Sequence, residues 1–395
     1  MPGPLHGFRI LDLSAVISGP FATMILADQG ADVIKVEPPG VGDFTRAAGN
    51  KSNGLSAAFL NNNRNKRSIC LDLKQPEGIA ALKRLAATCD ALVQNFRPGV
   101  VERMGIGEEA IREVRPDIVY VSISGFGESG PFSGKPVYDP IVQALSGLAS
   151  VQGGSDQERP RLIRTIVPDK VTAITASQAI TAALLSRERT GEGQHVRLSM
   201  IDAVTAFLWS SDMGGQTYVG KQVSQQRAAS FIDLIYETRD GHMSVAVMTD
   251  AQWRNLTQAF GTPEWLEDER FKTTALRDLN IDARLELIQS KLHEKTTDEW
   301  MRILSEHGVP CAPVLTRNDM IEHPQIQASG IVTENDHPIA GRLRQARPAA
   351  RYSVSPPEHR FGAPTLGQHS DEILEEAGFS TEEVAGLRER GVAGG

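Results

Sequence analysis

Residues 8–37, FRILDLSAVISGPFATMILADQGADVIKVE, decide the fold of this chain. Two short apolar runs, FRILDL (8–13) and DVIKVE (32–37), stand on either side of a longer apolar segment, FATMILADQG (21–30). Short runs rich in Val, Ile and Leu that alternate with a helical segment are typical of a β-α-β unit, in which a helix joins two parallel strands. The stretch therefore predicts two strands with a helix between them.

The same alternation continues outward from this unit through the first half of the chain. Further strands and helices are expected at SICLDL (68–73), EGIAALKRLAATC (77–89), ALVQNF (91–96), IVYVSIS (118–124), VTAITASQAITAALLS (171–186) and HVRLSM (195–200). Because strands alternate with helices, we expect the α/β class, with a large Rossmann-like domain built on a parallel-sheet core.

The length of the chain and the change in its sequence pattern after residue 205 predict more than one domain. Its 395 residues exceed what one hydrophobic core usually supports. Residues 1–205 are expected to form the first part of the large domain. Shorter strands and charged helices predict a smaller α+β domain over 206–329. The tail, 330–395, is rich in Pro and Gly and too poor in apolar residues to pack alone, so we expect it to return to the large domain.

Charge and cysteine usage exclude several classes of protein. A net charge of −8 argues against nucleic acid or an anionic membrane surface as the main partner. The cysteines, Cys70, Cys89 and Cys311, lie far apart without CxxC spacing, and the histidines lack metal-site spacing, so neither disulfides nor a metal is expected. Without a signal-peptide pattern or a long apolar run, the chain is expected to be cytoplasmic and not a membrane protein.

A glycine-rich segment, GFGESG (125–130), follows an expected strand and matches the G-x-G-x-x-G pattern of dinucleotide-binding proteins. In those proteins the pattern opens a helix whose N-terminus faces a pyrophosphate. Here Pro131 and Pro136 follow at once and forbid such a helix. We therefore expect no nicotinamide or flavin site, and interpret the glycines as a loop that passes close to another backbone or to a ligand.

Asp169 stands directly before the Ala-rich segment 171–186 and has two interpretations. Asp is a favoured helix N-cap, and from the residues alone this structural role is the better supported one. The alternative is a catalytic carboxylate, because a helix N-terminus keeps a carboxylate ionised and offers N–H donors to a developing oxyanion.

Basic residues recur near the expected strand ends of the first half, at Lys35, Arg46, Lys74, Arg97 and Arg103. Each could be ordinary solvated surface, which is the usual fate of Lys and Arg. Lys74 and Arg97 follow their strands directly, however, and the carboxyl ends of parallel strands form the ligand crevice of open α/β sheets. Cations at that edge favour a ligand that carries phosphate.

Several long ordered segments of the chain share one resemblance. They lie at residues 7–46, 63–74, 92–105, 122–147, 189–203 and 362–374, and include NRNKRSICLDLK, LVQNFRPGVVERMG and GAPTLGQHSDEIL. Taken in order, they resemble the class III CoA-transferases, the family that includes formyl-CoA transferase and the carnitine CoA-transferase group, with α-methylacyl-CoA racemase as a relative.

The resemblance implies an interlocked homodimer that moves CoA from an acyl-CoA to a carboxylic acid, with acyl-CoA as substrate and no permanently bound cofactor. Asp169 matches the catalytic aspartate of the family. The residues that match CoA-contacting stretches are Val16, Leu71, Asp72, Leu73, Lys74, Asn95, Phe96, Arg97, Arg103 and Tyr138, with Lys135 as a further candidate.

The implied mechanism is nucleophilic catalysis on Asp169. Its carboxylate attacks the donor thioester to give an aspartyl–acyl anhydride and CoA thiolate. The thiolate then attacks the aspartyl carbonyl, which releases the donor acid and leaves an aspartyl-CoA thioester. The acceptor acid reverses the sequence.

Two departures from the family pattern keep alternatives open. Residues 240–250 read DGHMSVAVMTD where formyl-CoA transferase has a run of glycines over its reaction centre, so a different covering of the site is expected. The racemase branch has a His base in the segment that matches residues 136–139; Tyr138 stands in that neighbourhood here, and a tyrosine is a poor base at neutral pH. A 2-methylacyl-CoA racemase and a non-catalytic CoA-binding partner remain the alternatives.

Overall fold

The computed structural model describes residues 3–221 and 234–394, and the chain divides into two compact units. The first comprises Met1–Gln226 together with Gly330–Gly395, and the second comprises Arg227–Ser329. The domain boundary expected between residues 205 and 206 falls inside helix α9, Met200–Trp209, and this helix belongs to the first unit. The division into separate domains that the sequence suggests stays a prediction.

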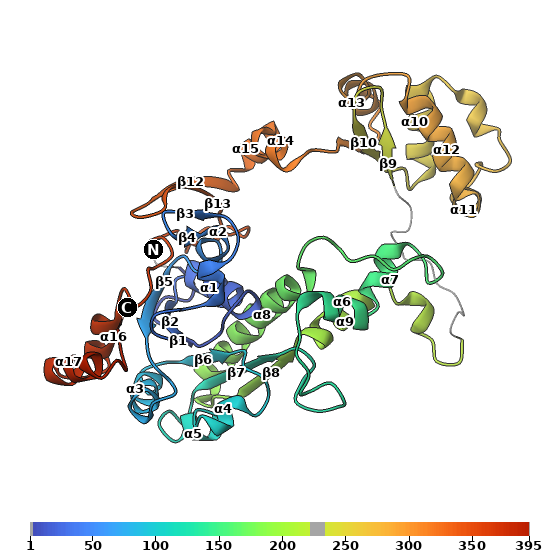
Figure 1. Cartoon of the computed structure of the whole chain (residues 1–395). Coiled ribbons are helices and arrows are strands. Elements are labelled where there is room, and N and C mark those ends of the chain that lie inside the picture. Colours follow the sequence, from blue (N-terminus) through green and yellow to red (C-terminus); the bar gives the residue numbers. More distant parts are fainter. Residues whose placement is uncertain (1–2, 222–233, 395) are drawn as a thin grey trace. The chain divides into compact units, whose positions relative to one another are not determined.

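The first unit contains a six-stranded sheet in which every neighbouring pair is parallel (Figure 1). Its strands are β1 Arg9–Asp12, β2 Asp32–Glu37, β5 Lys66–Cys70, β6 Ala91–Gln94, β7 Val119–Ser124 and β8 His195–Ser199. They lie in the order β5-β2-β1-β6-β7-β8, which is the order of doubly wound, Rossmann-type sheets. The predicted α/β class is confirmed, and each of these strands lies within or overlaps a segment that the sequence pattern indicated.

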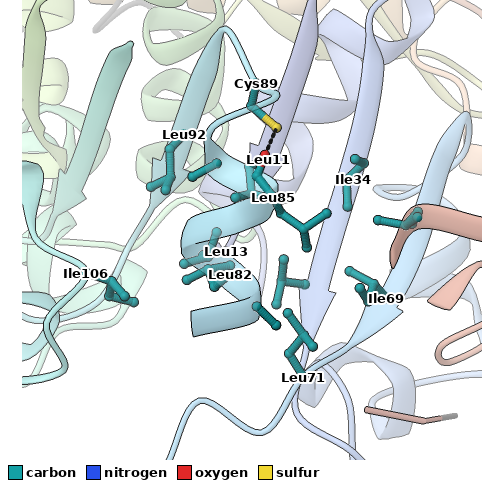
Figure 2. Close-up of a cluster of buried hydrophobic side chains, with 14 of the residues drawn as sticks. Leu11, Leu13, Ile34, Ile69, Leu71, Leu82, Leu85, Cys89, Leu92 and Ile106 are labelled. Atoms are coloured by element: carbon teal, nitrogen blue, oxygen red, sulfur yellow. Dashed lines mark hydrogen bonds between the residues drawn. The ribbon is translucent and has the colours of Figure 1, made fainter. Parts of the chain in front are cut away.

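Helices cover both faces of this sheet. Those of the first unit are α1 Ser18–Asp28, α2 Ala57–Leu60, α3 Pro76–Ala86, α4 Val100–Arg103, α5 Glu108–Arg112, α6 Asp139–Leu145, α7 Leu148–Gly153, α8 Val167–Thr190, α9, α16 Ser370–Glu376 and α17 Thr381–Glu389. Alternate residues of each strand point to opposite faces, which separates the core into two apolar clusters. On one face, Leu82 and Leu85 of α3 pack with Leu11 and Ile34 of the strands (Figure 2). On the other face, α1 and the Ala-rich α8 supply small and branched side chains.

The C-terminal segment lies against the β5 edge of the sheet (Figure 1). The backbone N–H of His369 donates to the Ser68 carbonyl at 2.9 Å, and Leu71 pairs with Ala393 in an isolated bridge. Ile373 of α16 packs into the same apolar cluster as α3. Short hairpins complete the unit: β3 Lys51–Ser52 with β4 Leu55–Ser56, and β12 Val332–His337 with β13 Gly341–Ala346. The Pro- and Gly-rich tail therefore uses the core of the first unit rather than one of its own.

The second unit is built around a small antiparallel sheet in the order β11-β10-β9, formed by Cys311–Pro313, His242–Val245 and Ile235–Glu237. Its helices are α10 Asp250–Phe260, α11 Thr274–Leu279, α12 Ile281–Leu292, α13 Thr297–Glu306, α14 Arg317–Glu322 and α15 Pro324–Ser329. Trp253 and Trp300 are almost fully buried in its core. Residues 240–250, where the resemblance led us to expect a different covering of the site, include β10, and Met243 and Val245 are core residues of the second unit.

Among the described residues, no helix combines the length and the apolar character needed to cross a bilayer.

Candidate active site

The sheet order reverses between β1 and β6, and the loops that follow these two strands diverge at that point. In open α/β sheets the ligand crevice lies outside the carboxyl ends of the strands at such a reversal. Asn95 ties the two loops together, because its Oδ1 accepts from the Ala15 N–H at 2.9 Å and its Nδ2 donates to the Ala15 carbonyl at 2.8 Å.

Val16, on the loop after β1, has a strained backbone. Its φ of 73° lies in the left-handed region, which is unfavourable for a β-branched residue. Its N–H donates to both carboxylate oxygens of Asp43 at 3.3 Å, and this contact holds the loop in place. Backbone strain of this kind costs on the order of 1–3 kcal/mol and is concentrated at functional sites.

A buried ion network lies beneath this loop. Lys35 Nζ contacts Asp43 Oδ2 at 2.9 Å and the Ser14 carbonyl at 2.9 Å, while Lys66 Nζ contacts Asp12 Oδ2 at 3.0 Å. Burial by itself would raise the pKa of Asp12, but Lys66 and Lys35, together with hydrogen bonds from the Ser14 and Thr23 hydroxyls, outweigh burial and lower that pKa to about 2. Burial lowers the pKa of Lys66 to about 8 despite the Asp12 carboxylate.

Two of the basic residues considered as phosphate ligands are used inside the protein. Lys35 is fully buried against Asp43, and Arg46 makes a two-pronged ion pair with Glu37, with both N–O distances at 2.7 Å. Lys35 and Arg46 are therefore not ordinary solvated surface, because each compensates a buried carboxylate.

Asp169 lies inside a helix rather than before one, so its predicted N-cap position is wrong. Helix α8 begins at Val167, with Ile166 as its N-cap, and Asp169 is the third helical residue. Pro168 fits the second position because the first turn of a helix needs no intrahelical N–H donor. The helix therefore starts before the apolar run that marked it in the sequence.

The charge state of Asp169 is set by burial and by a second carboxylate. Burial of this carboxyl and the nearby Asp139 raise its pKa to about 6, while hydrogen bonds from the N–H and hydroxyl of Ser18 oppose the shift. A group with this pKa is still mainly ionised at neutral pH. Ser18 is the first residue of α1, so two helix N-termini meet at Asp169.

Asp139 is a site residue that the sequence analysis missed. Its Oδ2 accepts from the Asp169 N–H at 3.3 Å, and its Oδ1 accepts from Gln143 Nε2 at 2.6 Å. Burial raises the pKa of Asp139 as well. The signal in the sequence was the pair Asp139-Pro140, which opens α6 beyond the glycine-rich segment and the residues 131–138 that follow it.

A hollow of about 190 Å³ gathers many of the predicted site residues around Asp169. Those that line it with Asp169 are Val16, Asn95, Phe96, Arg97, Lys135 and Tyr138. Gly125 closes one side, where a Cβ would approach the side chain of Val137 to 2.4 Å, and the next helix starts only at Asp139. The glycine-rich loop therefore opens no helix, and at Gly125 its close neighbour is a side chain rather than the backbone or ligand that the sequence analysis expected.

The remaining predicted residues line a second, larger cavity of about 880 Å³. They are Leu71, Asp72, Leu73, Lys74 and Arg103. Phe96 lines both cavities, so the two are neighbours in the first unit. The structure thus separates Lys74 and Arg103 from Arg97, which belongs to the smaller hollow. Within residues 3–221 and 234–394, no three His, Cys, Asp or Glu side chains gather closely enough to hold a metal ion.

Comparison with known proteins extends over nearly the whole chain. Residues 5–370 match CoA-transferase family III. Human succinyl-CoA:glutarate CoA-transferase is 35% identical over 380 residues, which cover 94% of this chain and 86% of that protein. Formyl-CoA:oxalate CoA-transferase of Escherichia coli is 32% identical over 415 residues, covering 98% of this chain and 99% of the relative.

Solved structures give the same similarity. A CAIB/BAIF family protein from Brucella suis superposes with a TM-score of 0.83 at 30% identity, covering 95% of this chain and 100% of that one. Rv3272 from Mycobacterium tuberculosis superposes with a TM-score of 0.82 at 28% identity, covering 94% of this chain and 99% of that one.

The paired carboxyl groups give a measurable prediction. Asp169 should titrate near its shifted pKa of about 6, and Asp139→Asn should lower that pKa, because the neighbouring negative charge is removed. The measurement is ¹³C NMR of protein with labelled aspartate carboxyl groups, with the Asp169→Asn spectrum assigning the signal. Titration of Asp169 close to the ordinary aspartate value in the unmodified protein would contradict this account.

Proposed function

This chain belongs to CoA-transferase family III and is an acyl-CoA:carboxylate CoA-transferase, and we propose that the transfer runs through covalent intermediates on Asp169 with a dicarboxylic acid as acceptor. The observation that carries the proposal is the position of Asp169: half-buried in a hollow at the sheet reversal, beside a second carboxyl group and facing the N-terminus of α1.

In the first half of the reaction, the Asp169 carboxylate attacks the carbonyl carbon of the donor thioester. The C–S bond breaks, CoA leaves as a thiolate, and an aspartyl–acyl anhydride remains. The thiolate then attacks the Asp169 carbonyl carbon, so the donor acid leaves as a carboxylate and Asp169 carries CoA as a thioester. No water takes part, so the activated bond is preserved.

In the second half, the acceptor carboxylate attacks the aspartyl-CoA thioester and displaces the CoA thiolate. The thiolate attacks the acceptor carbonyl of the new anhydride, which forms the product acyl-CoA and restores the Asp169 carboxylate. Each step transfers an acyl group between oxygen and sulfur with no net change in charge.

The surroundings of Asp169 suit its role as the nucleophile and its role as the carbonyl group that the CoA thiolate attacks. A raised pKa makes the carboxylate more basic, and hence more nucleophilic, while leaving it mainly ionised at neutral pH. Ser18 donates its N–H and hydroxyl to this carboxylate. When the thiolate attacks the Asp169 carbonyl, negative charge develops on an oxygen that these donors already contact, which stabilises the transition state.

The two neighbouring cavities suit an elongated ligand. Lys74 and Arg103 line the larger cavity and provide cations for the phosphates of CoA. The pantetheine arm would pass Phe96, which lines both cavities, and bring the thioester to Asp169.

The names of the relatives support a dicarboxylic acid as the acceptor. The human, mouse and Agrobacterium fabrum relatives are named for succinate or succinyl-CoA and glutarate, and the Acetobacter aceti and Escherichia coli relatives for oxalate. The racemase alternative lacks a comparable observation, since Tyr138 is 75% exposed and its hydroxyl is a poor base at neutral pH.

A homodimer forms part of the proposal, in the interlocked arrangement that the resemblance implies. Neighbouring helices α6, α8 and α9 leave large apolar side chains exposed: Ile141, Leu145, Ile174, Phe207 and Trp209. Apolar side chains grouped on adjacent elements mark surfaces that a partner covers. A second copy of the chain is the partner that we propose.

Asp169→Asn tests the nucleophile. Because Asp169 makes no N-cap bond in the described structure, the near-isosteric amide should leave the fold intact while removing the anionic nucleophile, so transfer should fall by about 10³-fold or more. Quenching wild-type turnover with hydroxylamine or borohydride and mapping peptides by mass spectrometry should place the adduct on residue 169.

The matched control is Asp298→Asn, an exposed Asp in the first turn of α13, which should keep full activity. Substantial transfer by the Asp169→Asn protein, or an adduct on another residue, would contradict the covalent mechanism.

Arg97→Ala tests the CoA site. Loss of one charge-assisted contact to phosphate should cost about 1.5–3 kcal/mol, or roughly a ten- to hundredfold rise in the Kd for CoA, measured by calorimetry. Arg254→Ala, at an exposed position of α10, should bind CoA as wild type does. Equal CoA affinity in the Arg97→Ala and wild-type proteins would exclude Arg97 from the site.

Sedimentation tests the dimer. The wild-type chain should sediment at twice its mass of 42.9 kDa, and Trp209→Glu should weaken association because it places a charge within an apolar contact. Leu279→Glu changes another exposed apolar residue, in the second unit, and should not weaken association. A monomer with full activity at micromolar concentration would refute the proposal.

A further inference from the structure

A row of polar side chains crosses three neighbouring strands beside the proposed active site. Gln94 of β6 and Ser122 of β7 are register partners, and Gln94 Nε2 donates to Ser122 Oγ at 2.9 Å. Ser122 Oγ lies 2.8 Å from Nε2 of His195, the first residue of β8. These side chains line a separate cavity of about 550 Å³, which adjoins the Asp169 hollow through Phe96 and Arg97.

The row ends at the turn that follows β6. Gln94 Oε1 accepts from the Phe96 N–H at 2.8 Å. Phe96 and Arg97 both line the hollow around Asp169, and Phe96 also lines the larger cavity. The orientation of the buried Gln94 amide therefore fixes the backbone of the turn that contains Phe96 and Arg97. This turn contributes to the hollow around Asp169 and, through Phe96, to the larger cavity.

Hydrogen-bond chemistry fixes the polarity of the Gln94 end of this row, and the protonation of His195 sets the other end. A backbone N–H only donates, so the oxygen of the Gln94 amide must face Phe96 and its NH₂ must face Ser122. Ser122 Oγ then accepts a hydrogen bond from Gln94 and can donate its own proton to one further acceptor. His195 Nε2 takes that proton in a hydrogen bond only if Nε2 is itself unprotonated.

The charges around His195 come from several elements. Arg197 on β8, Arg112 and Glu108 on α5, and Glu128 on the glycine-rich loop all act on the ring. Burial and Arg197 lower the pKa of His195, while Glu108 and Glu128 oppose them, so the imidazole is neutral at pH 7. Its Nδ1 is buried without a hydrogen-bond partner in the described part of the chain, and Glu108 Oε2 lies 3.8 Å away.

We propose that His195 and Ser122 are positioning residues for acyl-CoA: through Gln94 they hold the Phe96–Arg97 turn in the conformation that binds the ligand. This role rests on the proposed function, since it assumes that Phe96 and Arg97 contact acyl-CoA. When His195 is protonated, Nε2 donates to Ser122, and the Ser122 proton is left to pair with Gln94 Oε1, which requires the Gln94 amide to turn over and point its NH₂ at the Phe96 N–H. The Phe96 N–H then loses its acceptor and ligand affinity falls.

A purely structural role for His195 makes different predictions. The ring packs edge-on against Tyr120 with centroids 5.1 Å apart, and His195→Phe preserves an aromatic ring there while removing the acceptor. His195→Gln places an amide where Nε2 stood, so it can accept from Ser122, and it does not titrate. The two variants separate packing from hydrogen bonding.

The experiment measures the Kd for CoA by calorimetry in full-length Asp169→Asn protein, where Asp169 does not titrate. At about pH 7.5, adding His195→Phe should weaken binding about tenfold, whereas His195→Gln should stay within about twofold of its parent. Between about pH 7.5 and pH 5.5 the parent should lose affinity and the His195→Gln protein should lose distinctly less. Ser122→Ala should weaken binding as His195→Phe does, and thermal melts should show each variant folded.

Equal affinity of the His195→Phe protein and its parent would overturn the proposal. So would weakening by Gln without weakening by Phe, which would assign His195 to ring packing against Tyr120, or an unchanged pH dependence in the His195→Gln protein. Failure of the proposed CoA site is distinguishable, because Arg97→Ala would then bind CoA normally in the same assay. If the His195→Phe protein kept the parent's Kd for CoA while Arg97→Ala weakened CoA binding, only the positioning role of His195 and Ser122 would be rejected.

Discussion

Two buried ion pairs, Lys66 with Asp12 and Lys35 with Asp43, are the constraint on which the active-site region depends. Lys66 also donates to the Pro20 carbonyl at 2.8 Å and so fixes the start of α1, where Ser18 faces Asp169. Asp43 holds the strained Val16. Loss of one partner of a buried pair costs about 3–5 kcal/mol, because the other charge remains without compensation.

The same physical chemistry acts in opposite directions on two buried aspartates. Asp12 has lysine neighbours, and they lower its pKa to about 2, which keeps it a permanent anion with a structural role. The charged neighbour of Asp169 is another carboxylate, and burial raises its pKa to about 6. A carboxylate that is compensated holds the fold together, whereas one that is left basic can act as a nucleophile.

Much of the fold could be predicted from short-range patterns. DVIKVE forms β2 over its whole length, and the Ala-rich run lies inside α8, because apolar periodicity and the positions of Gly and Pro act within a few residues. Element ends were less certain, since α8 starts before its apolar run. The resemblance supplied the site residues, and the structure places many of them around one hollow.

What the sequence by itself determined was the α/β class, the β-α-β alternation and the residue types available for chemistry, because local patterning encodes them. Tertiary structure decided what each charged group does. Lys35 forms an ion pair with Asp43. Asp169 interacts with Ser18 and Asp139, which are distant from it in the chain. The physical reason is that burial and the distance between charges set a pKa, and both exist only once the chain has folded.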